Sequence, residues 1–522
     1  MGVESIIFGG MKRGPIVSVL SVVLSASFYI MYSIVPYSST NVPSKSLLPA
    51  YDFIIIGGGS AGAVIANRLS EIDDWDVLLL EAGRDGSAIY DIPAVAANLQ
   101  LTEIDWNYTT EPNGNYSGQE MGYEIRDING ERHTGFMIPQ GTIRHGSRCS
   151  TAKAFLRPAR TRKNLHVAME AHVTKILIDP SSKRAYGVQF VRDGETLRVH
   201  ANKEVIVSAG AINSPQLLML SGIGPIEHLK EHGIPVIQDL RVGHNLQDHV
   251  GVGGLVFLVN EEISSVQNNM TDISHILEYT IFGDDSLTTL GGIEGVAFIN
   301  TKYANDSDDF PDIELYLMSA IPNVNFGNIV SEGLGLSREF YDATSGKLGG
   351  KGMWAAIPSL LRPKSRGVIK LRSKDPFDHP LIYPNYFKEP EDMAKLIDGI
   401  KFALELSKTT PFKRYGNEMH TAPFPGCEHI PKYSDPYWEC MIRFLPLTIY
   451  HPSGTCRMGP KSDATAVVDP WLRVYGVAGL RVIDSSIMPN IVSGNINAPT
   501  IMIGEKGADM VKKEWLEDQG SD

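Results

Sequence analysis

Three glycines, Gly57, Gly59 and Gly62, follow a short apolar run at G-x-G-x-x-G spacing. The run, residues 53–56, is typical of a buried strand. At this spacing the first glycine allows a tight turn, and the second lets the backbone approach a pyrophosphate. The third lets a helix pack closely on the strand. These residue types therefore predict a loop that binds phosphate through its backbone.

The elements around the glycines complete a nucleotide-binding unit. Residues 61–70 are expected to form a helix, whose free N–H groups and partial positive charge would face the phosphates. A second strand, residues 76–81, ends in Glu81, 24 residues after Gly57, where a carboxylate that binds a ribose belongs. The unit predicts a dinucleotide site; the alternative is a glycine-rich loop in some other α/β protein.

Two further side chains suit chemistry beside such a cofactor. His451 lies in a loop of small residues, 450–459, just before the last expected strand. Asn495 comes just before the C-terminal helix, whose N-terminus would stabilise negative charge on a reduced ring. The alternatives are an ordinary surface or core histidine, and helix capping by Asn495 and Asn497.

Strands and helices that would position these residues come from both ends of the chain. Residues 204–208 form a buried strand that leads into a helix from Ser214, with Pro215 in its first turn. Residues 479–484 form a strand that ends in an acid, and residues 498–513 form a helix. We therefore expect a discontinuous nucleotide-binding domain over 51–250 and 451–514, after a signal or anchor and linker over 1–50.

The middle of the chain has a different pattern. Strand-like runs between 250 and 365 alternate with loops and a helix near 272–281, which predicts an antiparallel sheet. A long amphipathic helix follows at 389–408. The fold expected is α/β, with a Rossmann-like domain for the cofactor and an α+β substrate domain over 251–450.

Length, charge and missing motifs limit the classes of function that the chain can have. The chain has 522 residues and a net charge of −13, and this acidic balance disfavours a nucleic-acid partner. No G-x-S-x-G, HExxH, P-loop or EF-hand motif is present, and no cysteine or histidine spacing predicts a metal site. Redox chemistry on a dinucleotide is the main interpretation left.

The N-terminus predicts export. Residues 16–35 are uncharged and follow Lys12 and Arg13, as in a signal peptide, although their length also permits a membrane anchor. The protein is therefore expected to be secreted, with membrane contact only if this segment is not cleaved. Sequons at Asn107, Asn115, Asn269 and Asn305 suit a secreted chain. Cys427 and Cys440 are candidates for a disulfide, and two unpaired thiols are the alternative.

With these motifs in view, the chain resembles the glucose–methanol–choline (GMC) family of flavin oxidoreductases, in particular its insect glucose-dehydrogenase-like branch. The similarity covers nearly all of residues 51–510 and is carried by four blocks. They are Gly57–Gly62 with Glu81–Gly83, Gly210–Gly224, His451–Cys456, and Asp484 through Asn495 to Pro499. An NAD-dependent dehydrogenase would fit the first 90 residues but not the Gly210–Gly224 block.

The resemblance implies FAD as cofactor and oxidation of the CH–OH group of an alcohol or sugar. His451 would take the hydroxyl proton while a hydride passes to flavin N5, and Asn495 would hydrogen-bond the same oxygen. A small-molecule substrate and a separate electron acceptor would be the partners. The residues implied to bind FAD are Gly57, Gly59, Ser60, Ala61, Gly62, Glu81, Val173, Asp484, Asn495, Ala498 and Pro499.

One departure from the family bears on activity. Relatives carry a second glycine-rich segment, Arg-Gly-Lys-x-x-Gly-Gly-Ser-Ser, after the region that matches Trp106–Tyr108. Here the chain passes from Pro112 to Gln119 without it, which predicts an internal deletion around residues 112–119. Because that segment lines the pyrophosphate and the flavin, its loss would weaken FAD binding. An inactive or weakly FAD-binding paralogue or isoform is therefore the alternative function.

Overall fold

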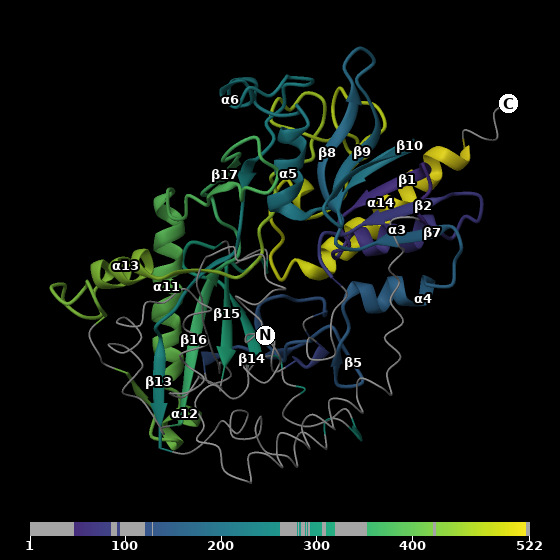
Figure 1. Ribbon diagram of the computed structural model, residues 1–522. Coiled ribbons are helices and arrows are strands. Elements are labelled where there is room, and N and C mark those ends of the chain that lie inside the picture. The colour runs from purple at the N-terminus through teal and green to yellow at the C-terminus, as the bar shows by residue number, and fades with distance from the viewer. Residues whose placement is uncertain are drawn as a thin grey trace, which may run out of the picture.

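The computed structural model describes residues 46–84, 91–93, 121–127, 129–260, 279, 281–282, 288, 290, 293–304, 309–318, 352–420 and 424–517. Several expectations lie outside these ranges: the segment 16–35, the four sequons and the expected deletion at 112–119. The helix expected near 272–281 lies almost wholly outside them as well. In the described part, two large sheets dominate, one at the upper right and one at the lower left of Figure 1.

The first sheet has seven strands in the order β7-β2-β1-β10-β9-β8, with β21 also paired to β10. Strands β7, β2, β1 and β21 run parallel to their neighbours, while β8, β9 and the first part of β10 form antiparallel pairs. The strands are β1 Ala50–Ile56, β2 Val77–Leu80, β7 Leu165–Ala168, β8 His172–Asp179, β9 Arg184–Arg192, β10 Glu195–Val207 and β21 Leu480–Val482.

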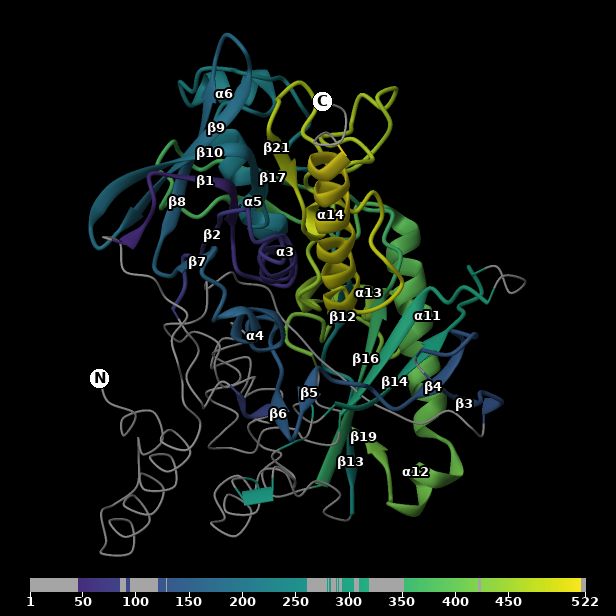
Figure 2. The ribbon, with the colours of Figure 1, turned by 90° about the vertical axis from the view of Figure 1, so that its right-hand side faces the viewer.

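Both ends of the chain meet on this sheet. Helix α3 (Gly62–Leu69) follows β1, and the C-terminal helix α14 (Asn497–Glu517) packs against it (Figure 2). A Cβ added at Gly504 of α14 would stand 3.0 Å from Ala61, so the two helices approach closely. Strands from both ends of the chain therefore share one sheet, while the division into domains stays a prediction.

The helix after β10 begins earlier than expected. Helix α5 spans Gly210–Leu220, so Pro215 lies inside it. The sequence analysis was wrong in placing Pro215 in the first turn. A proline has no N–H for the carbonyl four residues earlier, which here belongs to Ala211. The Thr455 hydroxyl donates to that carbonyl at 2.6 Å, which satisfies the oxygen and makes an internal proline tolerable.

The second sheet has nine strands and is mostly antiparallel, in the order β19-β13-β16-β15-β14-β4-β3, with β12 pairing β16 and β20. The long helix α11 (Pro390–Ser407) packs along β15 and β16. One of the strand-like runs expected between 250 and 365, residues 252–259, is interrupted at Gly254, which has φ +89°. The strands are β3 Ile125–Arg126, β4 Gly135–Met137, β12 Val250–Val252, β13 Val256–Val259, β14 Ile293–Ile299, β15 Ile313–Met318, β16 Gly352–Leu360, β19 Glu418–Met419 and β20 Pro446–Thr448.

Smaller elements complete the described chain. A three-stranded sheet joins β11 (His244–Leu246), β17 (Gly367–Lys370) and β18 (Leu381–Tyr383), and β5 (Ile143–Arg144) pairs with β6 (Ser147–Arg148). The remaining helices are the π-helical turn η5 Ala152–Leu156, α4 Arg157–Ala159, α6 Ile226–Glu231, α12 Thr410–Arg414, α13 Asp435–Phe444 and the 3₁₀ turn η8 Ser485–Ile487. Together these elements confirm the expected fold class.

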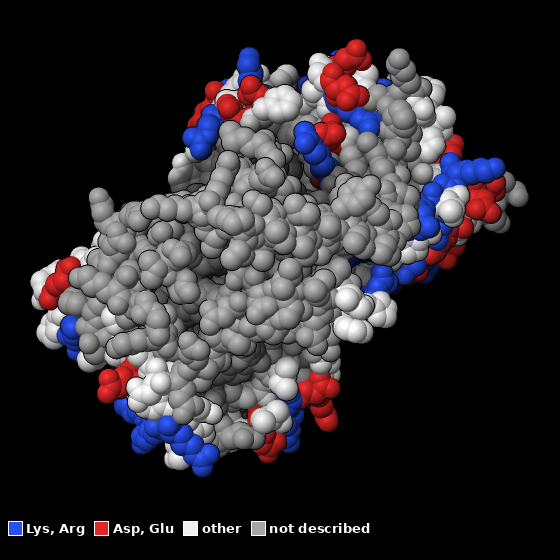
Figure 3. Space-filling model, turned by 60° about the horizontal axis from the view of Figure 1, so that its bottom comes forward, with Lys and Arg blue, Asp and Glu red and all other residues white. Residues whose placement is uncertain are grey.

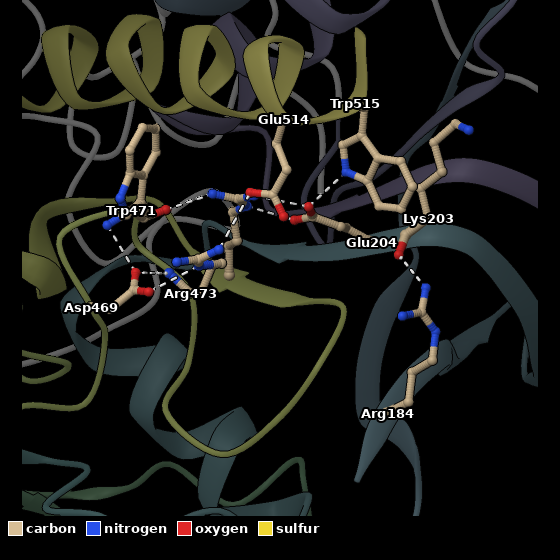
Figure 4. Close-up of polar contacts among 9 residues, drawn as sticks. Arg184, Lys203, Glu204, Asp469, Trp471, Arg473, Glu514 and Trp515 are labelled. Atoms are coloured by element: carbon tan, nitrogen blue, oxygen red, sulfur yellow. Dashed lines mark hydrogen bonds and ion pairs between the residues drawn. The ribbon is translucent and has the colours of Figure 1, made fainter. Parts of the chain in front are cut away.

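A buried ion-pair network fixes the last strand and helix to the first sheet. Arg481 of β21 is fully buried and donates to Glu204 of β10 at 2.6 and 3.0 Å. It also donates to Glu514 of α14 at 2.5 Å, and the Trp515 indole donates to Glu204 at 2.8 Å (Figure 4). The guanidinium thus ties a strand and a helix from the C-terminus to a central strand of the sheet.

Cys427 and Cys440 form a disulfide, which answers the open question of their pairing. Among the described residues, no helix is long and apolar enough to cross a membrane. On the face shown in Figure 3, basic and acidic side chains are interspersed over the described surface.

Candidate active site

A cavity of about 800 Å³ brings the predicted site residues together. Gly57, Gly59, Ser60, Ala61, Glu81, Val173, His451, Asp484 and Asn495 all line it. The cavity is of the size that suits a cofactor or a drug-sized ligand. Of the other predicted residues, Gly62 lies under the glycine loop, and Ala498 and Pro499 lie in the first turn of α14; these three are not among its described lining.

The glycine loop has the geometry of a backbone that makes room for a ligand. Gly57 has φ +98°, and a Cβ there would stand 2.5 Å from the Ser208 carbonyl oxygen. A Cβ at Gly62 would overlap the carbonyl oxygen of Gly57, so α3 packs directly on the turn. At Gly59 an added Cβ would meet no heavy atom within 4 Å. The loop therefore offers open space at its middle glycine and tight packing at its two ends.

Glu81 is fixed by the same loop. Its carboxylate accepts from the backbone N–H of Gly58 at 2.6 Å and of Gly83 at 2.7 Å. Val173 lies at the start of β8 and lines the same cavity. Both residues thus face the space into which the expected adenosine end of FAD would extend.

Asp484 joins the last strand to the start of α5. Its carboxylate accepts from the Gly210 N–H at 2.9 Å, from the Ser214 hydroxyl at 2.5 Å and from the Ser486 N–H at 2.8 Å. Burial raises the pKa of Asp484, and these donors act against that rise. The residue holds two elements together at the cavity wall, which is a structural role whatever it contacts in a ligand.

His451 and Asn495 lie within reach of each other. The Asn495 amide nitrogen is 3.4 Å from His451 Nε2, although 44 residues separate them in the chain. Burial, together with the smaller effect of the neighbouring His249, lowers the pKa of His451 to about 3. The imidazole is therefore neutral at neutral pH, because a buried charge would be poorly solvated.

Two residues that the sequence analysis missed hold His451 in place. Asp248 accepts from the His451 backbone N–H at 2.9 Å and from the hydroxyls of Tyr386 and Thr448 at 2.5 Å each. His249 Nδ1 lies 2.9 Å from His451 Nδ1. The only sequence signal was an Asp-His pair in a polar stretch, which no periodicity or spacing connects to a residue 202 positions later.

A buried carboxyl lies on β15, outside the cavity lining. Glu314 and Tyr316 are two residues apart on this strand, and both are buried. Tyr316 interacts with both Glu314 and Asn495. Burial raises the pKa of Glu314 to about 8, so the group is protonated at neutral pH. No sequence pattern distinguished it from the apolar residues around it.

Comparison with known proteins identifies the family. The chain matches the two GMC oxidoreductase family models, the N-terminal one over residues 114–251 and the C-terminal one over 363–504. It is 36% identical to a glucose dehydrogenase [FAD, quinone] of Drosophila pseudoobscura pseudoobscura, with 89% of this chain and 87% of the relative covered. This chain belongs to the GMC oxidoreductase family. Membership confirms the expected class, an FAD-dependent oxidoreductase.

Other members of the family agree. Human mitochondrial choline dehydrogenase is 32% identical, with 88% of this chain and 90% of that protein covered. Among solved structures, formate oxidase of Aspergillus oryzae RIB40 superimposes with a TM-score of 0.74 at 24% identity, covering 89% of this chain and 98% of that one. This structural likeness supports the fold alone.

The alignment with the Drosophila relative also shows a difference in length. It spans 568 positions, more than the 522 residues of this chain. Because 89% of the chain is about 465 residues, roughly 100 aligned positions hold a residue of the relative only. Relatives therefore carry segments that this chain lacks, while the place of the loss around residues 112–119 stays a prediction.

Proposed function

We propose that the protein oxidises the CH–OH group of an alcohol or sugar, with His451 as the base. The observation that carries the proposal is a single cavity. It is lined by the glycine loop and Glu81, and also by His451 and Asn495. A dinucleotide laid along it from Glu81 would have its reactive ring beside the two polar side chains. The residues present thus fit FAD.

Each side chain has a defined task in this proposal. Bound FAD supplies the hydride acceptor, flavin N5. His451 Nε2 takes the hydroxyl proton of the substrate, and its lowered pKa keeps the ring in the neutral form that can accept a proton. The Asn495 amide donates to the same oxygen and adds no charge. Positioning by these groups is the contribution of the protein, since the cofactor does the redox chemistry.

The cofactor contacts are part of the same proposal. Gly57, Gly59, Ser60, Ala61 and Gly62 would hold the pyrophosphate, and Glu81 and Val173 the adenosine end. Asp484, Asn495, Ala498 and Pro499 would hold the ribityl chain and ring. The Ser60 hydroxyl donates to Asn497 at 2.7 Å, which links the phosphate loop to the start of α14 and supports a shared site.

The visible spectrum of the purified full chain tests the proposal. We expect flavin absorption bands that bleach when an alcohol or sugar is added without oxygen. His451→Ala should slow bleaching by about 100-fold or more, the contribution of a positioned base. His429→Ala, at an exposed histidine outside the cavity lining, is the matched control and should bleach normally. Unchanged bleaching in the His451 variant would remove that residue from its role.

A second candidate function follows from the difference in length. If the segments present only in relatives include phosphate contacts, this chain would bind FAD weakly and act as a poor enzyme or none. A colourless, folded chain that gains no flavin bands on incubation with FAD would support this candidate over the first.

Location and partners complete the proposal. We infer a secreted protein, since a disulfide such as Cys427–Cys440 persists in oxidising compartments. The electron acceptor and the alcohol or sugar would reach the cavity from outside the cell. Expression in insect cells, followed by N-terminal sequencing of the medium fraction, should find a chain that begins after residue 35. Retention with membranes would instead favour the anchor.

A further inference from the structure

A second histidine stands behind the proposed base. His249 lies between β11 and β12 and is fully buried, and its Nδ1 is 2.9 Å from Nδ1 of His451. The two rings meet edge to face, at an interplanar angle of 86° and a centroid distance of 5.0 Å. Since two nitrogens this close must share one proton, the contact fixes which tautomer each ring adopts.

The far side of His249 decides where that proton is. Its Nε2 lies 3.0 Å from the carbonyl oxygen of Val492, which can only accept a hydrogen bond. Nε2 therefore carries a hydrogen. Burial lowers the pKa of His249 to about 4, against the carbonyls of Val492 and Leu361, which raise it, so the ring is neutral at neutral pH. With the hydrogen on Nε2 directed at Val492, the Nδ1 that contacts His451 is bare. His451 must then donate from its own Nδ1, which leaves His451 Nε2 without a hydrogen.

The opposite arrangement is unfavourable on both rings. A hydrogen on His451 Nε2 would set two bare Nδ1 atoms against each other. Moving the hydrogen of His249 to Nδ1 would repair that contact but turn a bare Nε2 towards the Val492 carbonyl. Either way a buried hydrogen bond is lost and two lone pairs face each other. Charging His249 would restore both contacts, but burial opposes it.

The backbone of His451 is held by different groups. Asp248 accepts from the His451 backbone N–H at 2.9 Å. The bare Nε2 faces the Asn495 amide, which can donate to it at 3.4 Å. Asp248 therefore places the residue, whereas His249 orients the ring and sets its hydrogen.

We propose that His249 is a positioning residue that holds His451 in the Nδ1–H tautomer, so that the bare Nε2 faces the cavity. The proposal rests on the proposed role of His451 as proton acceptor. In the other tautomer the nitrogen that faces the cavity would carry a hydrogen, and a hydroxyl proton could not be transferred to it. The tautomer itself is a property of the protein and is measurable without substrate turnover.

Nitrogen-15 NMR of the full chain with labelled histidine tests it, because bare and protonated ring nitrogens give well-separated signals. Loss of signals in His451→Ala assigns the resonances. We expect His451 to show a protonated Nδ1 and a bare Nε2, and His249 the reverse. His228 is an internal reference for a bare Nε2, since that atom accepts from the Leu371 N–H at 2.9 Å.

Two substitutions separate the tautomer effect from simple packing. In His249→Gln the amide oxygen can accept from His451 Nδ1 and the NH2 group can donate to Val492, so the His451 signals should stay unchanged. His249→Leu removes the acceptor, and His451 should lose its single tautomer. Where the chain turns over substrate, kcat should fall by about 100-fold in the leucine variant, and the glutamine variant should keep most of it.

The outcomes are distinct. A protonated His451 Nε2 in the unmodified chain, or in the glutamine variant, overturns the proposal, and so does an unchanged His451 tautomer in a folded leucine variant. If the leucine variant does not fold, the first two measurements decide. Failure of the proposed function appears elsewhere: His451→Ala would bleach normally while the tautomer stays as inferred.

Discussion

Alanine at two of the glycines should separate cofactor binding from folding. At Gly59 an added Cβ meets no heavy atom within 4 Å, and φ lies outside the left-handed region. Gly59→Ala should therefore leave the free energy of unfolding unchanged or raise it by up to about 1 kcal/mol, because alanine has less freedom in the unfolded chain. In the proposed site, the same methyl group would stand in the space where the pyrophosphate approaches the backbone.

At Gly62 the same substitution meets the protein itself. The Cβ would overlap the Gly57 carbonyl oxygen and stand 3.3 Å from Ser208 Cβ. Since the nearest atom belongs to the backbone, α3 must move away from β1. Overpacking of this kind costs about 1–3 kcal/mol, and we expect the upper end of that range for Gly62→Ala.

Denaturant unfolding of the FAD-free chain and titration with FAD measure the two effects. Both variants should bind FAD at least tenfold more weakly, about 1.4 kcal/mol, but only Gly62→Ala should unfold more easily. Normal FAD affinity in Gly59→Ala would show that the pyrophosphate does not approach this loop. Normal stability in Gly62→Ala would refute the close approach of helix and turn. The unfolding measurement tests the packing at Gly62 even if FAD binds too weakly to titrate.

Three further predictions concern buried charge and covalent linkage. Arg481→Met should lower the free energy of unfolding by about 3–5 kcal/mol in denaturant titrations, because it leaves Glu204 buried without its partner; an equally stable variant would contradict this. In the folded chain Glu314 keeps its proton up to a pKa of about 8, whereas in the unfolded chain it loses the proton above its ordinary pKa near 4.5. The free energy of unfolding should therefore fall as pH rises between these values. The stability of Glu314→Gln relative to the unmodified chain should be greater at pH 8 than at pH 5; a difference that does not change with pH would argue against a buried acid. Replacing Cys427 and Cys440 by serine should cost about 3 kcal/mol, the expectation for so short a loop, without changing FAD affinity.

The geometry of the glycine loop was predictable because it is decided locally. Gly57, Gly59 and Gly62 lie within six residues, and each has its role through its own backbone and the turn beside it. The parallel strands were also predictable, since burial on both faces gives continuous apolar runs such as Val77–Leu80. Sequence reading works well where the partners that decide a conformation are close in the chain.

The contacts that hold His451 were not predictable, for the opposite reason. His249 contacts His451, which lies 202 residues later in the chain. The Ala211 carbonyl, which finds no N–H at Pro215, accepts instead from Thr455, 244 residues later. Neither contact leaves a periodicity or a spacing in one sequence. The lowered pKa of His451 is also a property of the assembled cavity, because it comes from burial by residues that no local pattern brings together.

The proposed base and the glycine loop are therefore separable parts of the molecule. Asp248, His249 and Asn495 hold His451, and none of them belongs to the glycine loop. Loss of a second phosphate-binding segment would lower FAD affinity and leave this arrangement in place. A chain with the inferred His451 tautomer but no flavin bands would thus have lost the cofactor and kept the base. Bleaching that grows with added FAD would then identify a weak site, whereas a chain that stays colourless at any FAD concentration would have no site.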